Sequence, residues 1–352
     1  GELRDYQLEG YQWMARLAHW GAGACLADDM GLGKTIQALS LILSRAMNGP
    51  TLILAPTSVC MNWLEEAQRF APTLNVLHFG LGNRQKIIEQ AGAFDLVVCS
   101  YGLLQTESEL LTQKHWQTIV ADEAQAIKNG LTKRSQAAMA LQADFRVVTT
   151  GTPIENHLGE LWNLFHFINP GLLGSLKKFN EHYAQAIENN KDHAAQQRLK
   201  KLLRPFILRR LKSDVLKELP SRTEITLHVE LSKEERTFYE AMRRNAMQAM
   251  QDALKEGQQA GQQHLKILAE IMKLRRACCH PTLVMEDSPL SSAKLQAFEE
   301  LVDELIAGRH KALVFSQFVG HLHIIRDLLD KKGINYQYLD GSTSIPKRKK
   351  AV

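Results

Sequence analysis

The chain has 352 residues, of which 45% are hydrophobic and 23% charged, and its formal net charge is +5. This length predicts at least two units with cores of their own, whereas so mild a positive charge is only weak evidence for a polyanionic partner. Five cysteines without a CxxC pair argue against a disulfide framework or a zinc knuckle and favour a reducing compartment. No apolar run approaches the roughly 20 residues of a membrane span, and no signal peptide is visible.

From about Ala22 to Thr150, short runs rich in Val, Ile and Leu alternate with helical patterns. This alternation predicts an α/β fold in which helices cover both faces of a parallel sheet. The runs expected to form strands are Cys25–Asp28, Leu52–Ala55, Val76–Phe79, Leu96–Cys99, Ile119–Ala121 and Val147–Thr149.

The first of these runs leads into Leu26-Ala-Asp-Asp-Met-Gly-Leu-Gly-Lys-Thr35, where a strand–loop–helix phosphate cradle is expected. Glycines let backbone N–H groups converge on an anion, the lysine reaches the phosphates, and the Thr35 hydroxyl can hold Mg²⁺. Asp28 departs from the strict GxxxxGK[ST] pattern, because it stands where the first glycine should be. The residues predicted to bind the nucleotide here are Met30, Gly31, Leu32, Gly33, Lys34 and Thr35.

A second nucleotide motif lies at Thr118-Ile-Val-Ala-Asp-Glu-Ala-Gln125, an apolar run that ends in two adjacent carboxylates. At the carboxyl end of a strand, Asp122 is predicted to join the magnesium shell and Glu123 to orient and deprotonate the attacking water. Together with Lys34, these two carboxylates are the predicted catalytic residues. We expect two adjacent strands to present both motifs at the carboxyl edge of the sheet, where ligands of open α/β sheets bind.

From about Leu158 to Leu283 the pattern becomes mostly helical, with one strand-like segment at Glu224–Val229. The stretch Met242–His264 is rich in Gln, Met and Ala and predicts a long protruding helix or an irregular hinge. A run with Pro and Ser at 286–292 then precedes a second α/β pattern. Its expected elements are a helix at Ser292–Ile306, a buried strand at Ala312–Phe315, a helix at Leu322–Lys331 and a strand at Tyr336–Leu339.

We therefore predict a first ATP-binding lobe at 1–157, a helical insertion at 158–285, and a linker with the incomplete start of a second lobe at 286–352. Gly1 as first residue, and a last residue directly after a basic run, indicate a fragment. Residues from about Ser291 onward are expected to be poorly packed, or mobile relative to the first lobe, unless further chain or a partner completes them. The reason is that two βα units leave apolar strand faces and an unpaired edge uncovered.

With both nucleotide motifs placed, the chain resembles the Swi/Snf-type ATPases of helicase superfamily two, which are double-stranded nucleic-acid translocases. The resemblance implies RecA-like lobes and runs nearly end to end. Leu3-Arg-Asp-Tyr-Gln-Leu-Glu-Gly10 is similar to the opening element of that family, in which the Gln7 amide would read the adenine edge.

Further segments resemble the family's contacts to a nucleic-acid backbone. Leu54–Trp63 is similar to motif Ia, Cys99–Gly102 to the next backbone-contact motif, and Thr149–Asn156 with Glu160–Trp162 to motif III. Leu313–Phe318 and Tyr338–Thr343 look like the start of the second lobe. The residues that these motifs imply as nucleic-acid contacts are Thr57, Ser58, Asn62, Ser100, Tyr101, Ser316, Gln317, Ser342 and Thr343.

The strongest family signature is Arg204-Pro-Phe-Ile-Leu-Arg-Arg-Leu-Lys-Ser-Asp-Val215, followed by Leu219-Pro220. Residues 198–217 hold eight Lys or Arg against one Asp, which predicts a basic strip along a phosphate backbone, with Arg209 and Arg210 as contacts. The sequence strings look more like bacterial members of the family than eukaryotic remodellers.

The resemblance implies an ATP- and Mg²⁺-dependent translocase on double-stranded DNA. We expect it to act in the cytoplasm, in association with the nucleoid. A DNA-bound protein is a further candidate partner. The resemblance also implies two last motifs, including arginine fingers, which would lie beyond Thr343; residues 1–352 alone are therefore expected to hydrolyse little ATP. Three alternatives stay open at this point: an RNA-directed helicase of the same superfamily, a nonhydrolysing binding module, and a simple P-loop kinase or GTPase.

Overall fold

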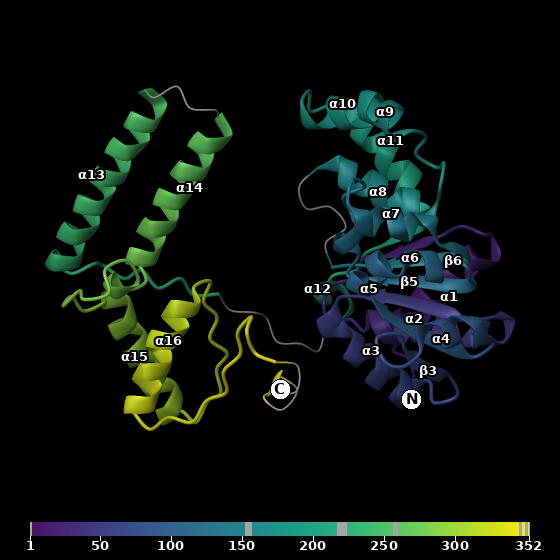
Figure 1. The fold of residues 1–352 in the computed structure, drawn as a ribbon, viewed down its shortest axis with the longest axis horizontal. Coiled ribbons are helices and arrows are strands. Elements are labelled where there is room, and N and C mark those ends of the chain that lie inside the picture. The colour runs from purple at the N-terminus through teal and green to yellow at the C-terminus, as the bar shows by residue number, and fades with distance from the viewer. Residues whose placement is uncertain are drawn as a thin grey trace. The chain divides into compact units, whose positions relative to one another are not determined.

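The computed structural model describes residues 2–151, 157–216, 224–255, 260–344, 347–348 and 351, with only the backbone of 252–255 and 260–263. The chain divides into two compact units, residues 1–221 and 222–352 (Figure 1). This division differs from the predicted boundaries at 157 and 285. The helices that follow Leu158 pack on the core of the first unit, where Leu161 and Phe165 are buried, and a late strand joins its sheet.

The described part of the first unit contains a seven-stranded sheet with the order β3-β4-β2-β5-β6-β1-β7, and every pair in it is parallel. Each of the six predicted strands is confirmed. The strands are β1 Ala24–Leu26, β2 Thr51–Ala55, β3 Asn75–His78, β4 Asp95–Ser100, β5 His115–Asp122, β6 Gln142–Thr149 and β7 Ile207–Leu208.

The helices of the first unit separate and cover these strands. They are α1 Asp5–His19, α2 Lys34–Arg45, α3 Thr57–Phe70, α4 Arg84–Gln90, α5 Tyr101–Thr106, α6 Ser108–Leu111, α7 Lys133–Ala140, α8 Leu158–Ile168, α9 Leu176–Phe179, α10 Gln185–Glu188, α11 His193–Leu203 and α12 Lys212–Val215. Short 3-10 or π turns lie at Ala46–Asn48, Ala124–Ile127, Asn180–Ala184 and Arg204–Phe206.

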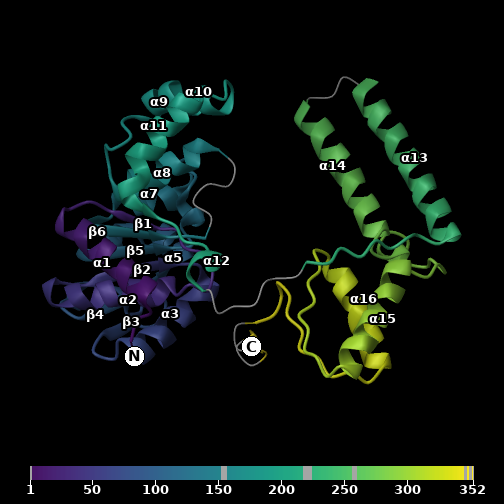
Figure 2. The ribbon, with the colours of Figure 1, turned by 180° about the vertical axis from the view of Figure 1, so that it is seen from behind.

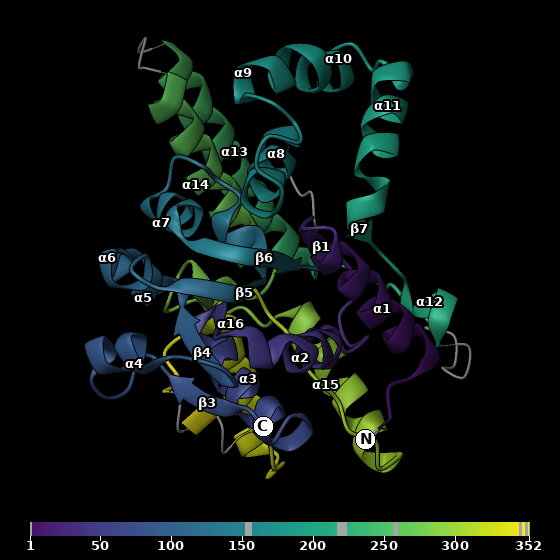
Figure 3. The same cartoon turned by 90° about the vertical axis from the view of Figure 1, so that its right-hand side faces the viewer.

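Alternate strand residues enter two separate cores, one on each face of the sheet. Leu52 and Leu54 pack in a cluster with residues of α5, α7, α8 and α11, whereas Ile53 packs on the opposite side with residues of α1, α2 and α3. Figure 3 shows α7 and α8 on one side of the sheet and α2 and α3 on the other. Strands buried on both faces read as continuous apolar runs, which is why they were visible in the sequence.

The second unit is helical where the structure describes it, with α13 Lys233–Lys255, α14 Ala260–Ala277, α15 Ala293–Ala307 and α16 Val319–Lys331. A short 3-10 turn lies at Pro281–Leu283. Figure 2 shows α13 and α14 side by side. The stretch Met242–His264 therefore contains the end of α13 and the start of α14, and residues 256–259 between them lie outside the described residues. The helices predicted at Ser292–Ile306 and Leu322–Lys331 are confirmed as α15 and α16.

Three predicted strands are wrong. The segments Glu224–Val229, Ala312–Phe315 and Tyr336–Leu339 form no strand, and Leu313 and Phe315 are 86% and 87% exposed instead of buried. A strand needs a neighbour to satisfy its backbone groups, and no described residue of this unit pairs with them. The expectation of poor packing after Ser291 is confirmed at Leu313 and Phe315 only, since Val302 and Ile325 of the same region are buried.

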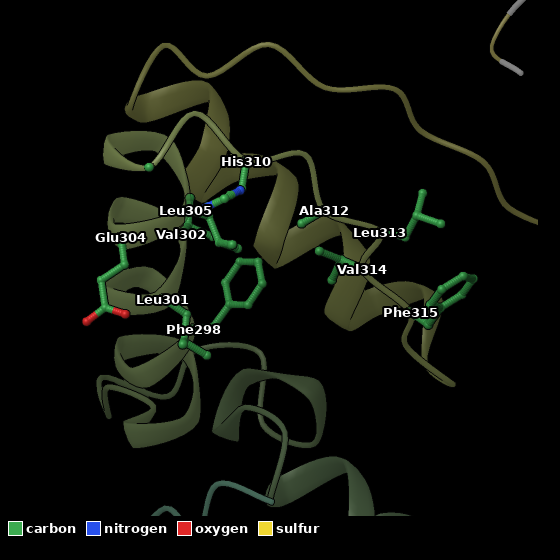
Figure 4. A pocket seen from close by; sticks show the side chains of 11 residues that line it. Phe298, Leu301, Val302, Glu304, Leu305, His310, Ala312, Leu313, Val314 and Phe315 are labelled. Atoms are coloured by element: carbon green, nitrogen blue, oxygen red, sulfur yellow. The ribbon is translucent and has the colours of Figure 1, made fainter. Parts of the chain in front are cut away.

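The segment after α15 nevertheless keeps the alternation of an extended chain. In Figure 4, Val314 points toward Phe298 of α15, whereas Leu313 and Phe315 point away. The apolar space between this segment and α15 is a cavity of about 590 Å³.

Among the described residues, no helix has the length and apolarity required to cross a membrane. Several predicted motif residues lie outside the described residues: those of motif III at 152–156, the end of the basic strip at Lys217, Leu219-Pro220, and part of the Met242–His264 stretch at 256–259.

Candidate nucleotide site and nucleic-acid surface

The two nucleotide motifs meet at the carboxyl edge of the sheet through a strand between them. In β1 Leu26 is in register with Thr149 of β6, and Thr149 is in register with Asp122 of β5. The prediction that the two motif strands are adjacent is therefore wrong, because β6 separates them. The three strand ends still lie in one row, so the motifs share one edge.

The loop after β1 has the backbone of a phosphate cradle. Gly31 and Gly33 have φ values of +84° and +74°, a region that side chains other than glycine rarely adopt. Gly33 is the N-cap of α2 and supplies no side-chain cap, so the first N–H groups of this helix are open to an anion. The Lys34 ammonium donates to the carbonyls of Asp28 and Asp29 at 2.9 Å and 3.3 Å.

Gln7, the predicted reader of adenine, lies directly over this loop. Its Nε2 donates to the Leu32 carbonyl at 3.3 Å, and its Oε1 accepts from the Arg4 backbone N–H at 3.0 Å. A Cβ on Gly33 would come within 2.5 Å of the Gln7 Nε2, so a larger residue at this position would displace the Gln7 amide. Met30 is 71% exposed, and Leu32 is buried and offers only its backbone.

Asp122 is a buried carboxylate with a fixed orientation. Its Oδ2 accepts from the Trp63 indole at 2.8 Å, and its Oδ1 accepts from the Thr149 hydroxyl at 2.5 Å. The Glu123 backbone N–H also donates to Oδ1, at 3.0 Å. Trp63 and Thr149 are positioning residues that sequence reasoning did not single out. The spacing of Cys60, Trp63 and Ala67 along α3 could have indicated an inward-facing indole.

Glu123 follows Asp122 in a conformation that is uncommon for a residue with a side chain. Its φ is +48°, and such a backbone costs of order 1–3 kcal/mol, which is characteristic of functional sites. Its Oε2 accepts from Gln125 Nε2 at 2.7 Å, and Gln125 Oε1 accepts from the Thr150 hydroxyl at 3.2 Å. A hydrogen-bonded chain thus joins Glu123 to the start of the motif III segment.

These side chains fit a nucleoside triphosphate with Mg²⁺. Thr35 is the second residue of α2, at the helix terminus that faces the loop. Asp122 is fixed by three donors and retains acceptor capacity on its oxygens. Carboxylate and hydroxyl oxygens are the ligands that Mg²⁺ prefers.

Arg210 does not lie on the basic strip as an open phosphate contact, which corrects the prediction for this residue. Its guanidinium forms a buried ion pair with Asp28, with NH2 to Oδ2 at 2.5 Å and Nε to Oδ1 at 3.0 Å. It also donates to Gln37 Oε1 at 2.8 Å and to the backbone carbonyl of Tyr6. The Asp28 side chain is 0% exposed and that of Arg210 11%, so each charge needs the other.

This ion pair explains why Asp28 departs from the glycine pattern: the carboxylate anchors the phosphate loop to a segment far along the chain. Gly10 belongs to the same arrangement, because a Cβ there would lie 2.8 Å from Arg210 NH2. Asp28, Gln37 and Gly10 are residues of the site that sequence reasoning missed as partners.

The predictions for Ser100 and Tyr101 as nucleic-acid contacts are also corrected. Both side chains are buried and stabilise the carboxyl edge of the sheet. Ser100 Oγ accepts from the Leu103 backbone N–H and caps α5. The Tyr101 hydroxyl donates to the Asp122 carbonyl at 2.8 Å. Burial, with the nearby Asp122 charge, raises the pKa of Tyr101 well above its ordinary value, so the hydroxyl stays a donor.

Four of the predicted nucleic-acid contacts in the first unit are exposed. Thr57, Ser58 and Asn62 lie in the first two turns of α3, and Arg209 follows β7. The α3 residues begin directly after β2, at the same carboxyl edge as the nucleotide loop. Hydroxyl and amide groups at a helix start, and a free guanidinium, are suited to phosphate oxygens.

The remaining predicted contacts belong to the second unit. Gln317 Oε1 accepts from Arg275, and Ser316 Oγ accepts from the Phe318 backbone N–H at 3.2 Å. Ser342 and Thr343 hydroxyls donate to Asp340 Oδ1 at 2.7 Å and 3.2 Å. Hydrogen bonds from Ser342 and from the Tyr338 hydroxyl, with a smaller contribution from Thr343, hold the pKa of Asp340 well below its usual value. Their role toward a nucleic acid stays a prediction.

Comparisons with family models and with known proteins agree on one family for this chain. A family model, the SNF2-related domain, matches residues 6–283. The Bacillus subtilis protein YwqA, named as an ATP-dependent helicase/translocase, is 39% identical over 364 residues, spanning 99% of this chain and 39% of that protein. The ISWI chromatin-remodeling complex ATPase CHR11 of Arabidopsis thaliana is 36% identical over 373 residues, spanning 100% of this chain and 34% of that protein.

A solved structure is also similar: the SWI2/SNF2 ATPase core of Sulfolobus solfataricus in complex with dsDNA. The TM-score is 0.60 at 34% sequence identity, with 99% of this chain and 74% of that chain covered. The chain spans less than half the length of the two relatives named above.

Proposed function

We propose a function from the premise that this chain belongs to the SNF2-related domain family: ATP binding and hydrolysis at the sheet edge of the first unit, coupled to movement along double-stranded DNA. The observation that carries the proposal is the row of Leu26, Thr149 and Asp122, which brings the phosphate loop and the acidic pair to one edge. Family membership argues against the rival of a simple P-loop kinase or GTPase.

Binding begins at the phosphate loop. The open N–H groups of α2 and the Lys34 ammonium would hold the phosphates, which requires Lys34 to leave the Asp28 and Asp29 carbonyls. Gln7, over the same loop, would hold the adenine. Thr35 and Asp122 would hold Mg²⁺, which supplies charge neutralisation for the phosphate oxygens.

Glu123 is the proposed base. Its strained backbone directs the side chain from the strand end, and its hydrogen bond from Gln125 holds the carboxylate in place. The carboxylate would orient a water molecule and accept its proton. The hydrogen bond between Gln125 and Thr150 would connect this carboxylate to the adjacent motif III segment. This arrangement makes Glu123 important for turnover rather than for ground-state binding.

The DNA surface would consist of the exposed residues near the same edge, Thr57, Ser58, Asn62 and Arg209. Contacts of this type go to phosphates and carry little sequence information. Binding should therefore be sequence-independent and steeply salt-dependent. The solved relative with dsDNA supports a duplex over RNA as the substrate.

A DNA-bound protein is the further partner that we propose, because relatives are named as chromatin-remodeling complex ATPases. We also propose a cytoplasmic, nucleoid-associated location, which is consistent with free cysteines throughout the described chain.

The test begins with ATP titrations of wild-type residues 1–352 and of the Lys34→Ala variant. The rate of ATP hydrolysis by the full-length gene product is then measured. We expect wild-type protein to bind ATP with Mg²⁺, and Lys34→Ala to lose this affinity while remaining folded by circular dichroism. ATP turnover should rise with double-stranded DNA of any sequence and respond less to double-stranded RNA. Stronger stimulation by RNA would assign the protein to the RNA-directed helicases instead, and unchanged ATP affinity in folded Lys34→Ala would remove the phosphate-loop assignment.

A further inference from the structure

The segment that follows β7 runs along the phosphate loop beyond the end of β1. Ala27 N–H donates to the Leu208 carbonyl at 2.7 Å, and Asp29 N–H donates to the Arg210 carbonyl at 3.0 Å. The backbone N–H of Lys212 then donates to Asp29 Oδ2 at 3.1 Å. Three successive hydrogen bonds therefore align this segment with the loop.

The buried ion pair of Arg210 and Asp28 locks that alignment. Both the backbone N–H and the Nε of Arg210 donate to Asp28 Oδ1, at 3.1 Å and 3.0 Å. Asp28 also accepts Lys34 through its backbone carbonyl, so the loop lysine and the segment after β7 are attached to one residue. A residue placed by this segment has a defined position over the loop.

That residue is Lys212. Its Cε and Nζ each lie 3.3 Å from the position that a Cβ on Gly31 would occupy, so the side chain lies across the bare glycine. Lys212 is exposed, and among the described residues no acceptor takes a hydrogen bond from its ammonium. A free cation thus stands beside backbone that is shaped for an anion.

The alternation of side chains along the extended segment explains why some of its cations face the phosphate loop and another faces solvent. Successive side chains of an extended chain point to opposite sides, so Arg210 and Lys212 share the side that faces the loop. Arg209 and Leu211 take the other side, and both are exposed. Arg210 is paired with Asp28, so Lys212 is the cation on this side of the segment that is available to a ligand in the loop.

We propose that Lys212 is a second phosphate-binding cation of the nucleotide site, which contacts the nucleotide's phosphates together with Lys34. This inference rests on the proposed function, because it concerns the same site. It assigns to the basic segment after β7 a role in nucleotide binding, separate from the DNA contact proposed for Arg209. Arg210 is its positioning residue.

The experiment is calorimetric titration of residues 1–352 with ATP, ADP and adenosine in the presence of Mg²⁺. The variants are Lys212→Ala, Lys212→Arg, and Lys177→Ala as a control that removes an exposed lysine of α9. A lost hydrogen bond between charged groups corresponds to about ten-fold in affinity. We expect Lys212→Ala to weaken ATP by about ten-fold, ADP by no more than ATP, and adenosine not at all.

Lys212→Arg should stay within about three-fold of wild type, and Lys177→Ala should match wild type for all three ligands. Dependence on the phosphates is a readout that a merely structural role would not produce, and equal melting temperatures of the ligand-free variants exclude a folding defect. Unchanged ATP affinity in Lys212→Ala, or an equal loss for adenosine, overturns the proposal and leaves the proposed function intact. If the wild-type protein binds no ATP, the role of Lys212 and the proposed function are both contradicted.

Discussion

Arg210 shows how one arginine can be misjudged from its neighbours. In the sequence it belongs to a strip of cations, whereas in the structure its guanidinium is buried against Asp28. The two residues are 182 positions apart, so no local pattern reveals the pair. The consequence is a stabilising role for a residue that composition assigned to the surface.

We predict that Arg210→Ala lowers the free energy of unfolding by about 3–5 kcal/mol, because it leaves the Asp28 carboxylate buried without a partner. Arg209→Ala, the matched neighbour on the exposed side, should change it by no more than about 0.5 kcal/mol. Denaturant unfolding measures both. The double variant Asp28→Ala with Arg210→Ala should lose less than the sum of the single variants, and strict additivity would contradict the ion pair.

Glu123 gives a second prediction for a single residue. In the full-length protein, Glu123→Gln should preserve ATP affinity and reduce kcat by at least about 100-fold, because the amide can hold water but cannot accept its proton. Single-turnover phosphate release and equilibrium binding distinguish the two effects. A kcat within a few-fold of wild type would show that another group is the base.

The cysteines differ in reactivity for reasons visible in their burial. Burial raises the pKa of Cys25 to about 12 and that of Cys60 to about 11. It also raises the pKa of Cys278, but Cys278 and Cys279 are only half-buried and therefore accessible to a reagent. Since a raised pKa lowers the thiolate fraction at any given pH, the first two thiols should resist iodoacetamide at pH 8. Mass spectrometry of native protein should find Cys278 or Cys279 labelled first, and early labelling of Cys25 would contradict the buried core.

At the scale of elements, the segment after β7 combines two functions that the sequence presents as one basic strip. Its exposed side offers Arg209, and its other side joins the phosphate loop through Arg210 and Lys212. A two-residue strand is too short to show a period, so β7 was not predicted. Its position at the sheet edge decides which cations remain available.

We therefore expect Arg209→Ala to weaken duplex DNA binding equally for different sequences and to reduce the slope of log K against log salt by about 1. Fluorescence anisotropy with two unrelated duplexes at several salt concentrations measures this. Lys86→Ala, which removes an exposed lysine of α4, is the control with the same change in charge. A loss confined to one duplex would argue for base reading instead of a phosphate contact.

The strands also show where periodicity succeeds and fails. The six predicted strands of the first unit are confirmed because each is apolar on both faces and lies between helices. The run Ala312–Phe315 has the same composition but no described neighbour to pair with, and Phe315 is 87% exposed. Apolar composition reports a tendency to be buried, and the burial itself depends on a partner.

At the scale of the whole molecule, every residue proposed to bind nucleotide belongs to the first unit. The phosphate loop, the acidic pair, Gln7 and Lys212 all precede the division at Ser221. The helices predicted as a separate insertion are part of this unit as far as α12. Nucleotide binding should therefore not depend on the second unit for its fold.

We predict that residues 1–221, expressed alone, unfold in one cooperative transition and bind ATP within a few-fold of residues 1–352. Thermal circular dichroism and calorimetric titration measure these two properties, with Lys34→Ala in the same fragment as the control for specific binding. An unfolded fragment, or one that has lost ATP binding, would show that the second unit completes the site.

By itself the sequence determined the α/β class, the six strands, the phosphate loop and the acidic pair, because each is encoded within a few consecutive residues. It also placed Thr57, Ser58 and Asn62 correctly at an exposed helix start, since a strand followed by polar residues predicts that junction. These features depend on local backbone preference and on burial of neighbouring side chains.

Only the tertiary structure decided which polar side chains remain available. It inserted β6 between the two motif strands, placed Ser100 and Tyr101 beneath the site, and paired Asp28 with Arg210. A buried charge or hydroxyl must find its partner in space, and that partner can lie anywhere in the chain. The position of β7 beside β1 brought these distant residues together and left Lys212 over the phosphate loop.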